Sequence, residues 1–358
     1  MTPFVTNYAA PGGKIASDGV TYEVTEPRTV VDIDRDLPWH SGRWPLESWF
    51  IVANLDAGGQ RIGLQVHFII QHLPAGTDVV ELNGIAVNET AGISRTFEHF
   101  YPLEQVGLGT DQMDISTPEL TFRGDRNGVA VHVTGKDAQI DITTTTAAPP
   151  VLFNGQGQVA FLGVDQQYDF AFPAMPTTGT VVLDQVAHQV TGISWLDRQW
   201  GGMPGIFTPM LGDGPQAPGA HGEAAPKVMN WIWANPQLDN GVNITMGQVR
   251  DMINHKIYLP LTAVHPDGTH VVVPCAQPVE ASEYWTSPAT GHRYPTRCVF
   301  RAPQINTELA VEVPYKQQEI VSAVDMFTKL EGSATVTGTY QGQPVTGRSY
   351  LELVGNWT

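Results

Sequence analysis

Short runs in which every second residue is hydrophobic, set apart by glycine and proline, restrict the fold of this chain most strongly. In the run from Gln60 to Ile70, the residues at positions 62, 64, 66, 68 and 70 are aliphatic or aromatic. Successive side chains of an extended strand point to opposite faces of a sheet. The run therefore predicts a strand with one apolar face. Gln65 and His67 lie on its other face, either as polar groups of a pocket or, as we expect, facing solvent.

The same period of two recurs at residues 129–133, 229–233 and 242–246. Turn signals such as Asn127-Gly128 separate the runs, in a chain that holds 36 Gly and 27 Pro. Windows of helical length with apolar residues three and four apart are hard to find. We therefore predict an all-β protein of antiparallel strands.

The length and one repeated string predict two domains in tandem. A chain of 358 residues exceeds the usual size of one domain. The string Val-Thr-Gly begins at Val190 and again at Val345, an offset of 345 − 190 = 155 residues. Residues 209–226 are rich in Gly, Pro and Ala and are typical of a linker or long loop. We predict β domains at 1–208 and 227–358. Closed barrels are favoured because they leave no exposed edge strand and enclose a ligand.

The charge and the two cysteines exclude several classes of partner. The net charge of −17 repels nucleic acid and anionic membrane surfaces. No segment reaches the roughly 18 apolar residues of a membrane span, and the first residues lack the pattern of a signal peptide, so we expect a cytoplasmic protein. Cys275 and Cys298 lack metal-site spacing. Buried free thiols are expected, with a disulfide between them as the alternative.

Common catalytic signatures are absent. The string ending at Lys14 lacks the first glycine and the final Ser or Thr of a phosphate-binding loop, and no Gly-x-Ser-x-Gly elbow occurs. The histidines do not cluster at metal-ligand spacing. We therefore expect neither a metal nor another cofactor.

The most unusual string surrounds Asp197, which lies between Trp195 and Trp200. In a strand, Trp195, Asp197 and Gln199 share one face. A carboxyl beside aromatic rings loses hydration, so its pKa rises and it keeps a proton near neutral pH. Such an acid protonates a carbon–carbon double bond, and indole faces stabilise the resulting cation. The alternative is that Asp197 pairs with Arg198 or another cation and ties the two domains together.

Further aromatic residues are candidates for the wall of a pocket. Glu47 and Trp49 share a strand face, and Glu47 is either a second acid of the pocket or an anchor for a neighbouring group. Trp231 and Trp233 also share a face, as core residues or, if a barrel closes around a cavity, as ligand walls.

These strings resemble a known family. Trp195-Leu-Asp-Arg-Gln-Trp-Gly201 is similar to the Trp-x-Asp-x-x-Trp-Gly motif of the carotenoid 1,2-hydratase and AttH-like group of lipocalin-like proteins. Glu47-Ser-Trp-Phe50 resembles its early Glu-x-Trp element. Residues 287–297, and Gly347-Arg-Ser-Tyr350 with the residues that follow, resemble its later signatures, which add Tyr350 to the candidate ligand contacts.

The resemblance implies two lipocalin-like β domains with a ligand site inside or between them. Some relatives hydrate isoprenoid double bonds with an acid of the Trp-x-Asp element, a role that would fall on Asp197. Kievitone hydratase and lipocalin-like Diels–Alderases are further relatives implied by the resemblance. Arg198 and Gln199 replace the His-Glu pair expected in typical hydratases, which departs from simple carotenoid hydration.

Three functions remain open, each with an apolar small molecule as partner. The first is an enzyme that adds water or an internal nucleophile across a double bond, with Asp197 as acid. The second is a pericyclic or cyclising isomerase in which the pocket orients the substrate. The third is a carrier of lipids or pigments that returns its ligand unchanged.

Overall fold

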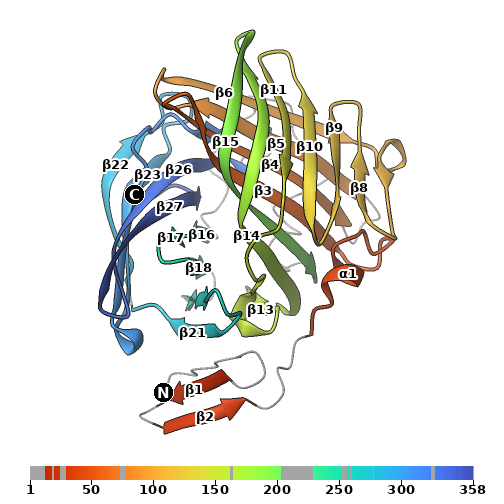
Figure 1. Cartoon of the computed structure of the whole chain (residues 1–358). Coiled ribbons are helices and arrows are strands. Elements are labelled where there is room, and N and C mark those ends of the chain that lie inside the picture. The colour runs from red at the N-terminus through yellow and green to blue at the C-terminus, as the bar shows by residue number, and fades with distance from the viewer. Residues whose placement is uncertain are drawn as a thin grey trace.

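Almost every element of the chain is a β-strand, and the strands form two large antiparallel sheets (Figure 1). The computed structural model describes residues 13–17, 20–24, 30–72, 78–161, 164–202, 229–251, 256–258, 260–276, 278–323 and 327–357. The prediction of an all-β fold is confirmed. The predicted linker, residues 209–226, lies outside the described residues.

The first sheet has the strand order β6-β5-β4-β3-β15-β14-β11-β10-β9-β8-β7, with β12 and β13 paired to β14. Its strands are β3 (Leu46–Ala57), β4 (Gln60–His72), β5 (Asp78–Asn88), β6 (Ile93–Tyr101), β7 (Gly107–Leu108), β8 (Met113–Ser116), β9 (Leu120–Asp125), β10 (Gly128–Thr134), β11 (Ala138–Thr144), β12 (Val151–Leu152), β13 (Gln158–Phe161), β14 (Val164–Leu183) and β15 (Val186–Gly201).

The second sheet has the order β21-β20-β18-β16-β27-β26-β24-β23-β22, and β17, β19 and β25 pair beside this path. Its strands are β16 (Met229–Ala234), β17 (Gln237–Leu238), β18 (Asn243–Asp251), β19 (Lys256–Tyr258), β20 (Pro260–Val264), β21 (His270–Pro274), β22 (Glu280–Thr286), β23 (Arg293–Ala302), β24 (Thr307–Glu312), β25 (Glu319–Ile320), β26 (Lys329–Tyr340) and β27 (Gln343–Val354).

The helical elements in the described part of the chain are short. They are α1 (Ile33–Asp36) and the 3₁₀ turns η1 (Leu103–Gln105), η2 (Phe153–Gly155) and η3 (Pro303–Ile305). The carboxylate of Asp32 caps α1 by accepting a hydrogen bond from the amide of Arg35. The strands β1 (Gly13–Ser17) and β2 (Val20–Val24) pair with each other. No helix among the described residues is long and apolar enough to cross a membrane.

Each sheet curls around its own apolar core. In the first sheet the apolar residues of each alternating run face inward. Val129, Val131 and Val133 of β10 are all buried, while the residues between them are exposed. The second core contains both cysteines, which are free and buried. Burial raises the pKa of each thiol to about 12. The prediction of buried free thiols is confirmed.

The repeated Val-Thr-Gly strings occupy equivalent places in two long hairpins, one in each sheet. In the β14–β15 hairpin Gly179 lies opposite Val190. In the β26–β27 hairpin Gly338 lies opposite Val345. The equal register indicates that the two sheets repeat one arrangement.

The glycine of each string packs against the backbone of the next strand. A Cβ atom added to Gly192 would lie 2.3 Å from the carbonyl oxygen of Asn54, and one added to Gly347 would lie 2.2 Å from that of Gln237. Both distances are too short for a side chain. Close approach of the strands therefore requires glycine at these two positions.

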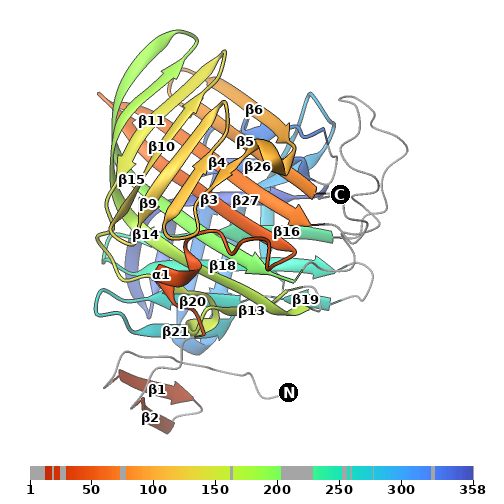
Figure 2. The same cartoon turned by 90° about the vertical axis from the view of Figure 1, so that its right-hand side faces the viewer.

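The two sheets lie against each other, as Figure 2 shows from the side, and an apolar seam joins them. The buried residues of the seam come from both sheets and are Phe50, Val52, Val151, Ala171, Trp195, Val264 and Tyr350. Hydrogen bonds also cross it. The Asn54 amide donates to the Ser349 carbonyl at 3.1 Å, and the Gln237 side chain accepts from the Ala174 amide at 2.7 Å. The convex face of the first sheet around β3, β4 and β15 is therefore covered.

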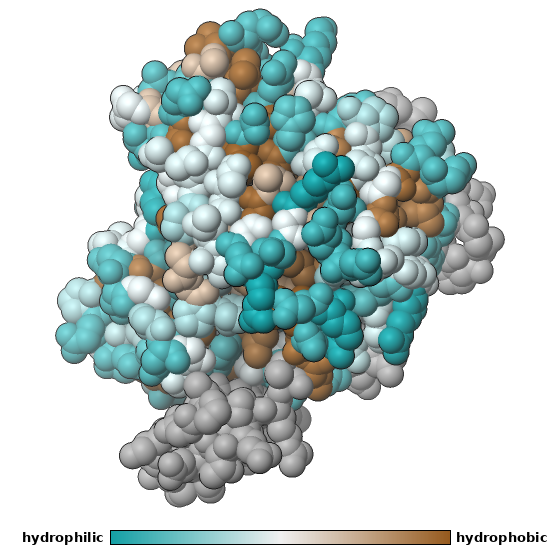
Figure 3. Space-filling model, turned by 45° about the vertical axis from the view of Figure 1, so that its right-hand side comes forward, coloured by the Kyte–Doolittle hydropathy of each residue, from teal (hydrophilic) through white to brown (hydrophobic). Residues whose placement is uncertain are grey.

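The outer surface offers little apolar area for a ligand. Among the described residues the large hydrophobic side chains that are exposed are Val30, Val186, Tyr284 and Val321. They are scattered along the chain, and the face shown in Figure 3 intersperses hydrophobic with hydrophilic residues.

Candidate functional site

A cavity of about 230 Å³ lies between the two sheets. Its wall on the first sheet comes from β3, β4, β5, β14 and β15, and its wall on the second comes from β16, β18, β26 and β27. The apolar part of the lining consists mainly of Leu46, Phe50, Ile69, Phe153, Val159, Trp231, Trp233, Val249, Phe327 and Val354.

Aromatic rings line the centre of the cavity. Trp231 and Trp233 both face it, as the ligand-wall alternative predicted. The ring of Trp233 meets Phe50 edge to face at 5.7 Å and Trp195 at 6.2 Å. Rings in this arrangement expose π-electron density, which stabilises a positive charge held nearby.

Asp197 faces the cavity from β15, together with Gln199. Its Oδ1 accepts a hydrogen bond from the indole N–H of Trp195 at 2.7 Å. Burial raises the pKa of Asp197 well above its ordinary value; the bond from Trp195 opposes this shift and the charge of Glu352 adds to it. The surroundings of Asp197 therefore favour its protonated form at a position that faces the cavity.

Asp169 is a second acid on the same wall, which the sequence did not single out. It lies on β14 opposite Gln199, and Ala171 lies opposite Asp197, so the two aspartates are diagonal neighbours on one face. Burial, followed by the charge of Asp197, raises the pKa of Asp169 well above its ordinary value. Its Oδ1 has no hydrogen-bond partner among the described residues. Two carboxyls on one face of the cavity wall thus each raise the cost of ionising the other.

The opposite wall carries a cation. Lys329 of β26 is buried and places its Nζ 2.7 Å from Glu331 and 3.2 Å from Glu352. Burial opposes the charge of Lys329, but the two carboxylates raise its pKa above the ordinary value. The same Nζ lies 5.3 Å from the centre of the Phe50 ring. Lys329 and Glu352 both line the cavity.

Polar side chains of β4 and β5 line a further part of the wall. The Nε2 of His67 lies 2.8 Å from the Ser48 hydroxyl, and burial, helped by Lys329, lowers the pKa of His67 well below its ordinary value. Asn83 donates a hydrogen bond to Glu81 at 2.7 Å. Burial and the charge of Glu98 raise the pKa of Glu81 to about 8.

The preference for a solvent-facing position of Gln65 and His67 is wrong. Gln65 is fully buried and its amide donates to Asn83 at 3.2 Å, while His67 lines the cavity. The physical reason is that the second sheet covers this face, which a strand pattern read by itself does not reveal.

Glu47 does not line the cavity, and this corrects its assignment as a second acid of the pocket. In the β3–β15 pairing, Asp197 lies opposite Phe50, so Glu47, three residues earlier, faces the interior of the first sheet. There it accepts a bond of 2.5 Å from Arg198 and lies 2.9 Å from Nδ1 of His40.

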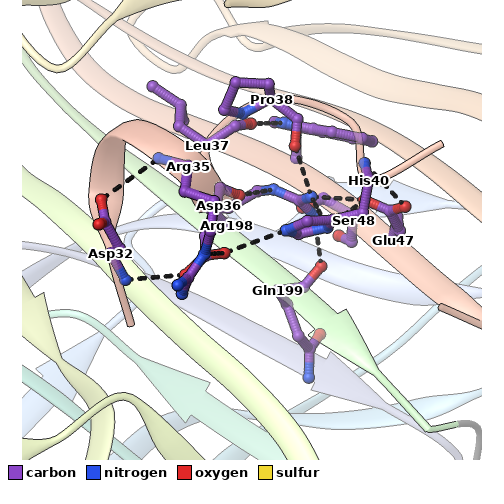
Figure 4. A network of polar contacts seen from close by, with 11 residues as sticks. Asp32, Arg35, Asp36, Leu37, Pro38, His40, Glu47, Ser48, Arg198 and Gln199 are labelled. Carbon is purple, nitrogen blue, oxygen red and sulfur yellow. Dashed lines mark hydrogen bonds and ion pairs between the residues drawn. The ribbon is translucent and has the colours of Figure 1, made fainter. Parts of the chain in front are cut away.

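Figure 4 shows the buried network around Arg198. Besides Glu47, the guanidinium donates to the carbonyl oxygens of Asp36 at 2.9 Å, Pro38 at 3.0 Å and Gln199 at 2.9 Å. It therefore ties the segment around α1 to β15. Because Arg198 points away from the cavity, the alternative of an ion pair between Asp197 and Arg198 is excluded.

The other residues predicted to contact a ligand lie on one or the other face of the first sheet, or in the seam between the sheets. Trp49 and Trp200 are buried in the core of the first sheet, where the Arg198 guanidinium lies 4.0 Å from the Trp49 ring. Trp195 and Tyr350 lie in the seam beside the cavity and do not line it. Of the predicted residues, the structure thus brings Asp197, His67, Trp231 and Trp233 together.

Sequence reasoning missed Asp169, Lys329 and Glu352. The signal for Glu352 was present, since it follows the second Val-Thr-Gly string as Asp197 follows the first. Asp169 and Lys329 carry no motif. No group of three or more His, Cys, Asp or Glu in the described part of the chain is arranged to hold a metal ion.

Two curled antiparallel sheets with a ligand-sized cavity between them define a lipocalin-like protein with a small-molecule site. The chain belongs to the AttH-like family, whose sequence profile matches residues 24–356. The search of curated proteins finds no match.

Solved structures share the fold at low sequence identity. A candidate AttH from Nitrosomonas europaea is 19% identical with a TM-score of 0.74, over 93% of this chain and 99% of that one. Kievitone hydratase from Nectria haematococca is 16% identical with a TM-score of 0.71, over 91% and 93%. CghA with Sch210972 is 13% identical with a TM-score of 0.56, over 99% of both chains. The lipocalin-like fold predicted from the motifs is confirmed.

Proposed function

We propose that this protein is an enzyme that adds water, or a nucleophile of the substrate itself, across a carbon–carbon double bond of an apolar small molecule. The observation that carries the proposal is a buried carboxylic acid, Asp197, that faces a cavity lined by aromatic rings. A terpenoid, polyene or polyketide fits the apolar lining. The family likeness to kievitone hydratase supports a reaction of this type.

The proposed reaction begins with proton transfer from Asp197 to one carbon of the double bond. The Asp197 O–H bond breaks, a C–H bond forms, and the neighbouring carbon becomes cationic. The rings of Phe50 and Trp233 stabilise this cation, and water or a substrate hydroxyl then adds to it. Asp169, on the same wall, helps to keep Asp197 in its protonated form before the transfer.

A second candidate is a cyclising isomerase, favoured by the likeness to CghA over nearly the whole chain. In that case the cavity holds the substrate in a folded conformation and Asp197 only orients it. Reaction in D₂O that carries ¹⁸O separates the candidates. Hydration adds both ¹⁸O and deuterium to the product, whereas addition of a substrate hydroxyl places deuterium on carbon without ¹⁸O. A pericyclic isomerase adds neither label, and a carrier returns its ligand unaltered.

The Asp197→Asn variant tests the acid, with Asp111→Asn, an exposed position, as the matched control. Asn keeps the size of the side chain and removes the transferable proton, so the turnover number for hydration of the substrate should fall about 100-fold or more. Infrared difference spectra at neutral pH should also lose the band of a protonated carboxylic acid. An unchanged rate constant, with an intact band, removes Asp197 from the mechanism.

A further inference from the structure

The walls of the cavity are built from corresponding strands of the two sheets. The offset of 155 residues between the Val-Thr-Gly strings relates Asp197 to Glu352, since 197 + 155 = 352. Asp197 lies opposite Phe50 on β3, and Glu352 lies opposite Trp233 on β16. All four residues line the cavity. The two acids are thus counterparts on facing walls.

The neighbour of each acid differs between the two walls. On the first wall β14 places Asp169 opposite Gln199. At the corresponding position of the second wall β26 places Lys329 opposite Val354. All four of these residues line the cavity as well. One acid therefore has a carboxyl as its neighbour, whereas its counterpart has an ammonium group.

This difference gives the two acids unlike surroundings. Asp197 lies buried beside another acid, which favours its protonated form. Glu352 forms an ion pair of 3.2 Å with Lys329. Two acids in such unlike surroundings are suited to act as donor and acceptor in one reaction.

The two acids line one cavity on either side of a single aromatic contact. Their strand partners Phe50 and Trp233 meet edge to face at 5.7 Å. One substrate in the cavity can therefore contact both acids.

We propose that Glu352 is the general base that works opposite Asp197 on the same substrate. This inference rests on the proposed function. As Asp197 gives its proton to one alkene carbon, Glu352 takes a proton from the water molecule or substrate hydroxyl that attacks the other. A C–O bond forms and the O–H bond of the nucleophile breaks. The net change is addition of H and OR across the double bond, and exchange with solvent returns a proton from Glu352 to Asp197.

A purely structural function for Glu352 explains less. Lys329 has a closer carboxyl partner in Glu331, at 2.7 Å and fully buried, and burial raises the pKa of Glu331 well above its ordinary value. The side chain of Glu352 retains 13% exposure, whereas that of Glu331 has none. Glu352 is thus the carboxylate of this group that a ligand reaches.

A cationic probe tests the charge of Glu352 without requiring a substrate. N,N-dimethyldodecylamine is an ammonium ion at neutral pH and mimics the proposed cation, and N,N-dimethyldodecanamide is a neutral molecule with the same skeleton. Binding of both is measured by calorimetry on the wild type and on the Glu352→Gln and Asp197→Asn variants, after melting curves establish that each is folded.

The wild type should bind the amine at least tenfold more tightly than the amide, because a charge-assisted contact to a carboxylate is added. Glu352→Gln should abolish this preference and Asp197→Asn should keep it. An absent preference, or one that survives in Glu352→Gln, overturns the inference. If Glu352→Gln does not fold, the inference is tested by two other measurements. They are the amine-to-amide affinity ratio of the wild type and the retention of that ratio in Glu352→Asp. Because binding is measured, loss of the proposed hydration activity would not by itself produce either result.

Discussion

Replacing Glu47 by Gln should destabilise the protein strongly while leaving its ligand site intact. The side chains of Glu47 and Arg198 are both fully buried. Among the hydrogen bonds of the described residues, the Glu47 carboxylate is the only acidic group within 3 Å of the Arg198 guanidinium. The change keeps the volume of the side chain and leaves the positive charge of Arg198 without its counter-ion.

The size of the effect follows from the remaining contacts of Arg198. Removing one partner of a buried ion pair costs about 3–5 kcal/mol. The guanidinium keeps its bonds to four carbonyl oxygens and its place over the Trp49 ring, which favours the lower end of this range. We therefore expect a loss of about 3 kcal/mol, a large part of the 5–15 kcal/mol typical of folded proteins.

Urea unfolding followed by tryptophan fluorescence measures the loss, with the exposed Glu104→Gln as the matched control. The pH dependence supplies a second reading. Burial raises the pKa of Glu47, but His40 and Arg198 outweigh it, so the pKa lies below the ordinary 4.5. The stabilisation is present above pH 4.5 and is lost as the pH falls through the lower value, so wild type and variant should converge in acid.

A loss below about 1 kcal/mol in Glu47→Gln would refute this account of the network. Unchanged stability together with a lost affinity for cavity ligands would instead restore Glu47 to the ligand site.

Two further predictions concern the cavity wall and the repeated hairpins. The pKa of Glu81 is about 8 in the folded protein, against an ordinary 4.5, so between these pH values the folded protein holds a proton that the unfolded chain has released. The free energy of unfolding should therefore decline as the pH rises from 4.5 to 8. The Glu81→Gln variant should show a smaller decline in its urea midpoint across the same range. Gly192→Ala should lower the free energy of unfolding by about 1–3 kcal/mol, because the new Cβ meets the Asn54 carbonyl oxygen. The control Thr191→Ala, at an exposed position, should change it little. Equal effects of the two changes would show that the close approach at Gly192 does not require glycine.

The faces of individual strands could be predicted from the sequence. The alternation around Asp197 correctly places Asp197 and Gln199 together and Arg198 on the other side, because side-chain direction in a strand depends only on local backbone geometry. The two related hairpins were also visible, since the Val-Thr-Gly strings mark positions where two strands touch.

What the sequence did not reveal depends on contacts between distant strands. Glu47 was grouped with Asp197 because both lie near tryptophans, but the register of β3 against β15 puts Phe50 there instead. His67 was expected to face solvent because nothing in its own strand indicates the second sheet above it. Asp169 and Lys329 belong to the site only because neighbouring strands place the carboxyls of Asp197 and Glu352 beside them.

The correspondence between the two hairpins shows what one chain permits that a pair of identical copies does not. In a symmetric pair both walls would carry the same acid beside the same neighbour. Because both walls belong to one chain, each can differ by itself, and a carboxyl with an aspartate neighbour here faces a carboxyl with a lysine neighbour.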